Sequence, residues 1–97
     1  NTKLFSYLAN LKREIPNFTV LGTTAHKEKT IWDVNLSVPL MLMMGNETMG
    51  LNKAFKEACD ILCTIPMAKT SYASSFNVSC AASILMYEVV RQRGGKI

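Results

Sequence analysis

The sequence predicts an α/β domain in which helices flank a parallel sheet, and three observations support this fold class. Segments typical of strands alternate with segments typical of helices, in the order helix, strand, loop, strand, helix, strand, helix. The run of residues 40–44 is apolar at every position, as in a parallel strand that is covered on both faces. Helical periodicity marks both ends of the chain, over residues 2–14 and 75–92.

The N-terminal half begins with the helix over residues 2–14, and Pro16 prevents its continuation. Four apolar residues recur there at the spacing of one helix face: Leu4, Leu8, Leu11 and Ile15. A short strand follows over residues 18–21 and stops at Gly22. The polar stretch 23–37 then predicts a loop with one short turn.

The C-terminal half contributes two strands and two helices. Residues 40–44 form the strand expected at the centre of the sheet, and Asn52 caps the helix that follows. Residues 61–65 form the last strand, which Pro66 ends. The helix over residues 75–92 carries apolar residues on two faces, so we expect burial on more than one side. The second of these faces holds Cys80, Ile84 and Tyr87.

Composition places the chain among globular proteins. Hydrophobic residues make up 48% and charged residues 19%, which excludes a disordered chain. No apolar run approaches the ~20 residues of a membrane span, and residues 1–10 lack the apolar core of a signal peptide. We therefore expect one cytoplasmic domain over residues 1–97, without a membrane partner. The net charge of +4 permits an RNA or DNA partner but does not require one.

The three cysteines are Cys59, Cys63 and Cys80, and all lie in apolar periodic segments. They predict buried free thiols in a reducing compartment. The first two have a spacing that could serve a metal, but a second pair is lacking and His26 is the sole histidine. We therefore predict no metal site.

The first stretch that could carry chemistry is the turn from Gly45 to Gly50, between a buried strand and a helix. Ligands of open α/β sheets bind where strands end, and a glycine lets a ligand approach the backbone closely. The turn lacks the lysine of a phosphate loop and the spacing of a dinucleotide fingerprint. Local features alone favour the alternative, a plain strand-to-helix turn with a capping Asn and a surface Glu.

The second such stretch comprises Ile65-Pro66-Met67 and the polar cluster at residues 74–79. Ser75 and Asn77, with the free amides of the first helical turn, could hold a carboxylate or a ribose hydroxyl. The alternative is an ordinary helix N-cap, for which Ser and Asn are preferred residues. Taken alone, the stretch favours that alternative.

Together the two stretches resemble a known family. Residues 42–51, which read LMMGNETMGL, resemble the second signature of the SpoU-type (TrmH-like) RNA methyltransferases of the SPOUT superfamily. Residues 65–67 (IPM), 75–79 (SFNVS) and 87–88 (YE) resemble the third. The similarity covers about residues 18–93, with the two signatures in order and a strand-turn-helix-strand-helix context between them.

The resemblance implies an α/β fold with a deep trefoil knot at its C-terminal end. It implies S-adenosylmethionine as the cofactor, bound in the knot, and a homodimeric assembly. The implied reaction is methylation of a ribose 2′-hydroxyl of tRNA or rRNA. The knot would form from the loops at residues 45–50 and 67–74, with the last helix tucked through.

The resemblance also implies roles for individual residues. The cofactor pocket would be lined by Met44, Gly45, Asn46, Gly50, Ile65 and Met67. Phe76 would pack near the adenine. Ser75 and Asn77 would lie beside the methionine part of the cofactor and the target ribose, as cofactor-binding and catalytic residues. Glu47 matches the acid of the signature and would orient the catalytic site.

The chain departs from the family pattern in several places. The first signature, with its catalytic arginine, is not in these 97 residues, so the resemblance implies the C-terminal, cofactor-binding portion of an enzyme whose first signature lies upstream. The loop after Met67 is longer than the common pattern, and Ser74 stands where a Glu is usual. Two alternatives stay open. One is a non-catalytic RNA-binding or dimerisation module of the same fold, and the other is a flavodoxin-like nucleotide-binding domain.

Overall fold

The computed structural model describes residues 2–24, 29–45, 53–66 and 78–95. Along the chain the elements are α1 (Thr2–Glu14), β1 (Thr19–Thr23), the 3₁₀ helix η1 (Ile31–Asp33), β2 (Leu40–Met43), α2 (Lys53–Ala58), β3 (Ile61–Cys63) and α3 (Val78–Gln92). The alternation of strands and helices is the predicted one. The polar stretch before β2 contains one short turn, η1, which begins at a Thr30–Asp33 capping box. The expected cap at Asn52 lies outside the described residues.

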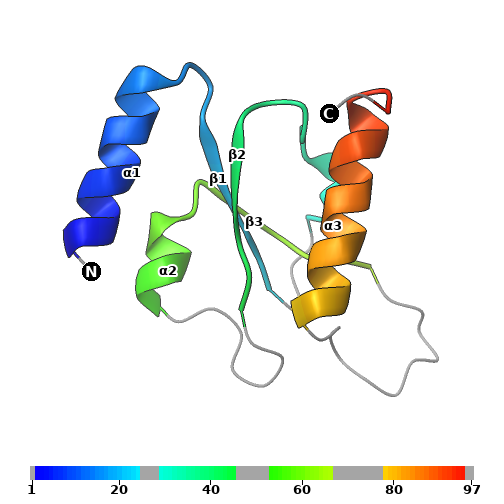
Figure 1. The fold of residues 1–97 in the computed structure, drawn as a ribbon. Helices are drawn as coiled ribbons and strands as arrows, with labels where there is room; N and C mark the ends of the chain where they lie inside the picture. The colour runs from blue at the N-terminus through cyan, green and yellow to red at the C-terminus, as the bar shows by residue number, and fades with distance from the viewer. Residues whose placement is uncertain (1, 25–28, 46–52, 67–77, 96–97) are drawn as a thin grey trace.

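The three strands form a parallel sheet in the order β2-β1-β3 (Figure 1). Leu21 in β1 stands opposite Leu42 on one side and Ile61 on the other. The prediction that residues 40–44 form the central strand is therefore wrong for the described sheet, because β1 lies between the other two. Burial follows the pairing, since Val20 and Leu21 of β1 are fully buried whereas every residue of β2 is half-buried.

Helices cover both faces of the sheet in a three-layer arrangement. In Figure 1, α1 and α2 lie on one side of the strands and α3 on the other. The α1–α2 side holds a buried cluster of Leu8, Val20 and Ala58. The flanking Leu4 and Leu11 pack against this cluster, which confirms the predicted apolar face of the first helix.

The α3 side holds the larger cluster. Its buried members come from β1, η1, the segment before β2, β3 and α3: Leu21, Ile31, Val34, Leu36, Cys63 and Leu85. Burying a large aliphatic side chain stabilises a fold by about 1.5–3 kcal/mol. The cluster therefore fixes α3 and the segment 31–36 against the sheet.

A hydrogen-bond network joins the end of α3 to the segment before β2. Gln92 Nε2 donates to the Val34 carbonyl (3.0 Å), and Gln92 Oε1 accepts from the Leu36 amide (2.8 Å). Arg93 donates to the Leu36 and Val38 carbonyls at 3.2 and 2.8 Å. These two side chains thus satisfy the backbone of a segment that has no sheet partner of its own.

Glycines end α3 as the sequence predicts. Gly94 and Gly95 have φ values of 69° and 80°, in the left-handed region that favours glycine. The Gly95 amide donates to the Val90 carbonyl (2.8 Å) and the Gly94 amide to the Arg91 carbonyl (3.1 Å). This pair of bonds is a Schellman motif, which satisfies the last helical carbonyls.

Two expectations about buried side chains are wrong in part. Tyr87 is 71% exposed and Cys80 is also exposed, whereas Ile84 is half-buried and packs against the cluster on the α3 side, so the second apolar face is buried only in part. Of the three thiols expected in the core, only Cys63 is fully buried, and Cys59 is half-buried. Periodicity identified the face of α3 that packs on the sheet, but it did not show how much of the second face the sheet covers.

Asp60 ties α1 to the sheet. Its carboxylate forms an ion pair with Lys12 and accepts a hydrogen bond from the Val20 amide (2.8 Å). Partial burial acts to raise the pKa of Asp60, but the bonds from Lys12 and Val20 outweigh it and hold that pKa below its usual value. The ionised carboxylate is thus the form that holds these elements together.

Candidate functional site

The carboxyl ends of all three strands meet at one edge of the sheet. The chain passes from β1 to β2 on one side and then back across β1 to β3 on the other. At the end of β1, the Thr23 hydroxyl lies 3.7 Å from Met44 Sδ, and the amide of the next residue, Thr24, donates to the Cys63 carbonyl (2.9 Å). Both neighbouring strands therefore contact β1 here, at the kind of position where open α/β sheets bind ligands.

A buried hydroxyl without a partner marks this edge. Thr24 Oγ1 is shielded from solvent and has no hydrogen-bond partner among the described residues. Leaving such a group unsatisfied costs about 1–3 kcal/mol. Buried polar groups of native proteins are nearly always paired, and unpaired ones concentrate where a ligand or water completes them. The Thr24 hydroxyl is thus a polar group whose hydrogen-bonding capacity the described residues leave unused.

The exit of β3 is held in place by a short backbone ladder. The Thr64 amide donates to the Lys29 carbonyl (2.9 Å), and the Ile31 amide donates to the Thr64 carbonyl (3.0 Å). This parallel bridge, centred on Thr30 and Thr64, continues the pairing beyond the last residue of β3. It fixes the direction in which Ile65 and Pro66 leave the sheet.

The described part of the predicted site consists of Met44, Gly45 and Ile65. Met44 and Ile65 both pack against the cluster on the α3 side, so the structure brings the ends of β2 and β3 to the same edge. Gly45 follows Met44 and is half-buried. The remaining predicted residues lie outside the described ranges: Asn46, Glu47, Gly50, Met67, Ser75, Phe76 and Asn77.

Sequence reasoning missed Thr23 and Thr24, which it assigned to a polar loop. Two consecutive threonines directly after Gly22, where the predicted strand stops, were the available signal. Their position at the carboxyl end of the central strand makes them candidates for ligand contact.

Thiol chemistry does not fit this edge. Burial raises the pKa of Cys63 to about 11, although the nearby Lys29 acts to lower it. Burial also raises the pKa of Cys59, with a smaller contribution from Asp60. Because the thiolate is the nucleophilic form, neither cysteine is a nucleophile at neutral pH.

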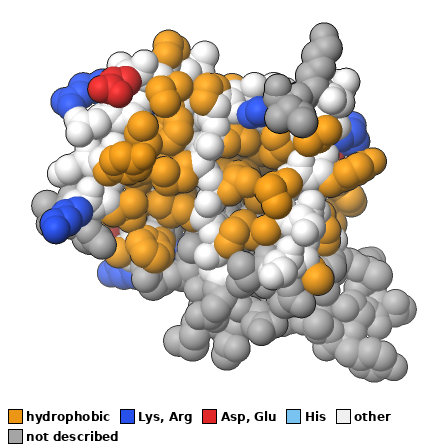
Figure 2. All heavy atoms as spheres, in the orientation of Figure 1, with side chains coloured by type: hydrophobic (Ala, Val, Ile, Leu, Met, Phe, Trp, Pro, Cys, Tyr) orange, Lys and Arg blue, Asp and Glu red, His pale blue; other side chains and the backbone are white. Residues whose placement is uncertain are grey.

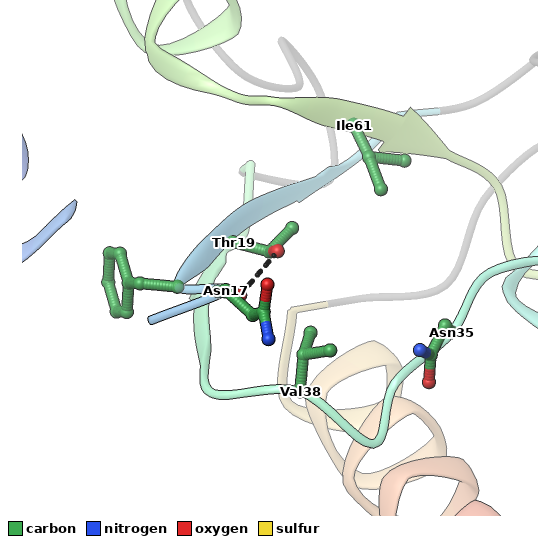
Figure 3. Close-up of a pocket in the computed structure, with 6 residues that line it drawn as sticks. Asn17, Thr19, Asn35, Val38 and Ile61 are labelled. Carbon is green, nitrogen blue, oxygen red and sulfur yellow. Dashed lines mark hydrogen bonds between the residues drawn. The ribbon is translucent and has the colours of Figure 1, made fainter. Parts of the chain in front are cut away.

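A hollow of about 430 Å³ lies at the opposite edge of the sheet, beside the amino ends of the strands (Figure 3). Its walls are formed by Asn17, Phe18, Thr19, Asn35, Val38 and Ile61. Polar groups in this hollow already bond to their neighbours, since the Thr19 hydroxyl donates to the Asn17 carbonyl (3.0 Å) and Asn35 Oδ1 accepts from the Ser37 amide (2.9 Å). The hollow therefore offers less unsatisfied polarity than the carboxyl edge.

The described residues contain neither a cluster of metal-binding side chains nor a membrane-spanning helix. Residues 2–24, 29–45, 53–66 and 78–95 contain no group of three His, Cys, Asp or Glu side chains that could hold a metal ion. No helix within these ranges has both the length and the apolar character needed to cross a membrane.

The sequence model of one protein family, described as the SpoU rRNA Methylase family, matches residues 1–87 of this chain. The match begins at residue 1, so it includes α1, which the expected range of about 18–93 left out. That the chain is the C-terminal, cofactor-binding portion of a longer enzyme stays a prediction.

Individual proteins similar to this chain are also RNA-modifying enzymes or SpoU methyltransferases by name. A 23S rRNA (guanosine-2′-O-)-methyltransferase RlmB of Pectobacterium atrosepticum is 42% identical over 79 residues, 81% of this chain and 32% of the relative. The SpoU methyltransferase AviRb of Streptomyces viridochromogenes, solved in complex with AdoMet, matches with a TM-score of 0.85 and 33% identity, over 98% of this chain and 37% of AviRb. The A. aeolicus TrmH/SpoU tRNA modifying enzyme matches with a TM-score of 0.76 and 33% identity, over 92% of this chain and 44% of that enzyme. The chain thus spans 32–44% of the length of these relatives.

Proposed function

The chain belongs to the SpoU rRNA methylase family, and from this premise we propose that it binds S-adenosylmethionine at the carboxyl edge of its sheet and serves 2′-O-methylation of RNA ribose. The convergence of three strand ends around the unpaired Thr24 hydroxyl carries the proposal. The AdoMet complex of the similar AviRb supports the choice of cofactor.

The residues at this edge fit such a cofactor. The buried Thr24 hydroxyl is a hydrogen-bonding group for a nucleoside or amino-acid moiety. Met44 and Ile65 provide apolar surface for an adenine ring, and Gly45 lets the ligand approach the backbone. Asn46, Gly50, Met67 and Phe76 complete the proposed pocket. When bound, S-adenosylmethionine supplies an electrophilic methyl group.

The proposed catalytic residues are Ser75, Asn77 and Glu47. A ribose hydroxyl is a poor nucleophile at neutral pH, so it needs a group that accepts its proton or stabilises the developing alkoxide. Asn77 and Ser75 hold the ribose and the methionine part of the cofactor in line, and Glu47 orients these groups. Such positioning supplies much of the catalysis in a direct transfer.

We propose rRNA as the substrate class. The relative RlmB is named as a 23S rRNA methyltransferase, whereas the similar A. aeolicus structure is named as a tRNA modifying enzyme. The net charge of +4 favours contact with phosphates in either case. A cytoplasmic location follows from this substrate.

The resemblance also leads us to propose a trefoil knot and a homodimer. The knot would involve the loops at residues 45–50 and 67–74. The dimer would use the outer face of α3, where Met86, Tyr87 and Val90 are large exposed apolar residues. Exposed apolar side chains gathered on one helix are typical of a protein–protein contact.

A single-turnover assay tests the proposal. The natural-length protein is mixed with radiolabelled S-adenosylmethionine and 23S rRNA fragments, and methylated ribose is quantified after digestion. Asn77→Ala should lower the transfer rate at least tenfold without loss of folding, whereas Asn10→Ala, at an exposed position of α1, should leave it unchanged.

Equal rates for wild type and Asn77→Ala would refute the assigned role of Asn77. RNA binding without any methyl transfer by the wild type would instead favour the non-catalytic module.

A further inference from the structure

The side-chain amide of Gln92, at the end of α3, joins that helix to η1. Its Nε2 donates to the Val34 carbonyl and to Glu88 Oε2, both at 3.0 Å, and the Ile31 carbonyl lies 3.5 Å away. Its Oε1 accepts from the Leu36 amide (2.8 Å). Because Ile31 begins η1 and Val34 follows its last residue, one amide group holds both ends of this short helix.

The partners of Gln92 lie in apolar surroundings. Ile31, Val34 and Leu36 are buried members of the cluster on the α3 side, and Val89 of α3 packs against that cluster. Figure 2 shows hydrophobic side chains over much of the described face of the molecule, with Lys and Arg side chains toward its margins. Buried backbone groups in such surroundings have little water to bond to, so removal of the Gln92 amide would leave them unsatisfied.

η1 is bonded in turn to the exit of β3. The Ile31 amide donates to the Thr64 carbonyl (3.0 Å), and the Thr64 amide donates to the Lys29 carbonyl (2.9 Å). The preceding carbonyl, that of Cys63, accepts from the Thr24 amide (2.9 Å) at the end of β1. The end of β3 is therefore held between the start of η1 and the end of β1, at the carboxyl edge of the sheet.

We propose that Gln92 is a positioning residue for the cofactor edge and that it acts through η1 and Thr64. Gln92 holds η1 against α3, and η1 sets the direction in which Ile65, the residue after Thr64, leaves β3. Ile65 packs against the same cluster and belongs to the proposed cofactor pocket. The inference rests on the proposed function, because the position of Ile65 matters for the reaction only if S-adenosylmethionine binds there.

Hydrogen exchange of the natural-length protein tests the link from Gln92 to β3 without any ligand. Gln92→Met keeps the length of the side chain but removes its bonding groups. The Ile31 and Thr64 amides should exchange roughly tenfold faster in this variant than in wild type, because η1 loses its support. The Thr19 amide, which donates to the Pro39 carbonyl at the amino edge, should exchange at the wild-type rate.

Wild-type exchange of the Ile31 and Thr64 amides in Gln92→Met would overturn the proposal. Equal acceleration of the Thr19 amide would overturn it too, because it would show that the variant loosens the whole fold.

Steady-state methyl transfer by the natural-length protein tests the consequence for the cofactor. Gln92→Met should raise the KM for S-adenosylmethionine about fivefold or more, while kcat at saturating cofactor changes less than about twofold. A purely structural role predicts the opposite split, because a smaller folded fraction lowers kcat at an unchanged KM, and that result would overturn the proposal. Asp60→Ala is the matched control, since it removes a bond on the α1 side and should leave this KM unchanged.

Failure of the proposed function gives a different result. A folded wild-type protein that neither binds S-adenosylmethionine nor transfers its methyl group would overturn the proposed function, and the cofactor role of Gln92 with it. An active wild type with an unchanged KM in Gln92→Met would overturn the positioning role alone.

Discussion

Glu88 provides the sharpest test of how the structure is held together. Its side chain lies on α3, and the residue is only 5% exposed. Its two oxygens accept a bidentate pair of bonds from Arg91 at 2.7 and 2.8 Å, and Oε2 also accepts from Gln92 at 3.0 Å. Gln92 is the residue that bonds to the segment before β2. Glu88→Gln keeps the size of the side chain but removes the charge.

The magnitude follows from the pKa of Glu88. The bonds from Arg91 and Gln92 lower this pKa from 4.5 to about 2. At 1.36 kcal/mol per tenfold change in proton affinity, the ionised form contributes at most about 3 kcal/mol. Because the Arg91 side chain is 58% exposed and water screens its charge, we expect a contribution of roughly 1–2 kcal/mol.

The sign of the pH dependence is fixed by the lowered pKa. The contribution is fully present above about pH 4.5 and is lost as the pH falls toward 2, because only the unfolded state takes up the proton readily in that window. Urea unfolding at pH 7 should show Glu88→Gln to be less stable than wild type by roughly 1–2 kcal/mol. The difference should shrink toward zero near pH 2.

Glu57→Gln, at an exposed position of α2, serves as the matched control and should change stability by less than about 0.5 kcal/mol. An equal deficit of Glu88→Gln at pH 7 and near pH 2 would refute the electrostatic reasoning. Wild-type stability at pH 7 in Glu88→Gln would refute it as well.

Three further predictions concern the core and the thiols. Asp60→Ala removes the acceptor of the Val20 amide and should lower the free energy of unfolding in urea by about 1–3 kcal/mol, and an unchanged value would exclude that role. Leu85→Ala leaves a cavity at a fully buried site and should cost about 2–5 kcal/mol in thermal unfolding, so a loss below 1 kcal/mol would contradict the packing described. Cys80 should react with a thiol reagent in the native protein, whereas Cys63 should react only on unfolding. Peptide mass mapping measures the two modifications, and faster modification of Cys63 than of Cys80 in the native protein would contradict the burial pattern.

Much of the fold could be predicted because local patterns determine it. The apolar spacing of α1, the proline after β3 and the glycine pair after α3 each define an element without help from distant residues. The centre of the sheet could not be predicted in this way. Residues of β2 are apolar on both faces, which indicates an interior strand. Only the hydrogen-bonded pairing of the strands in the structure shows that β1 lies between β2 and β3.

Some residues of the candidate site were likewise predicted from the sequence, and others were missed. The resemblance to the family implied that Met44 and Ile65 line one pocket, and both residues pack against the same cluster at the carboxyl edge of the sheet. Thr24 was missed because a buried hydroxyl without a partner is visible only when the surrounding chain is in place. The support of the segment before β2 by Gln92 and Arg93 was missed for a related reason, since nothing in a helix pattern shows which distant carbonyls its polar ends reach.

The proposed cofactor site is tested most directly by calorimetric titration with S-adenosylmethionine. We predict saturable binding at one site per chain, and weaker binding by Thr24→Val, which removes the unpaired hydroxyl but keeps the shape of the side chain. Thr19→Val, at the amino end of the same strand, should bind like wild type. The absence of binding heat in a sample whose circular dichroism shows a folded protein would contradict the proposed site.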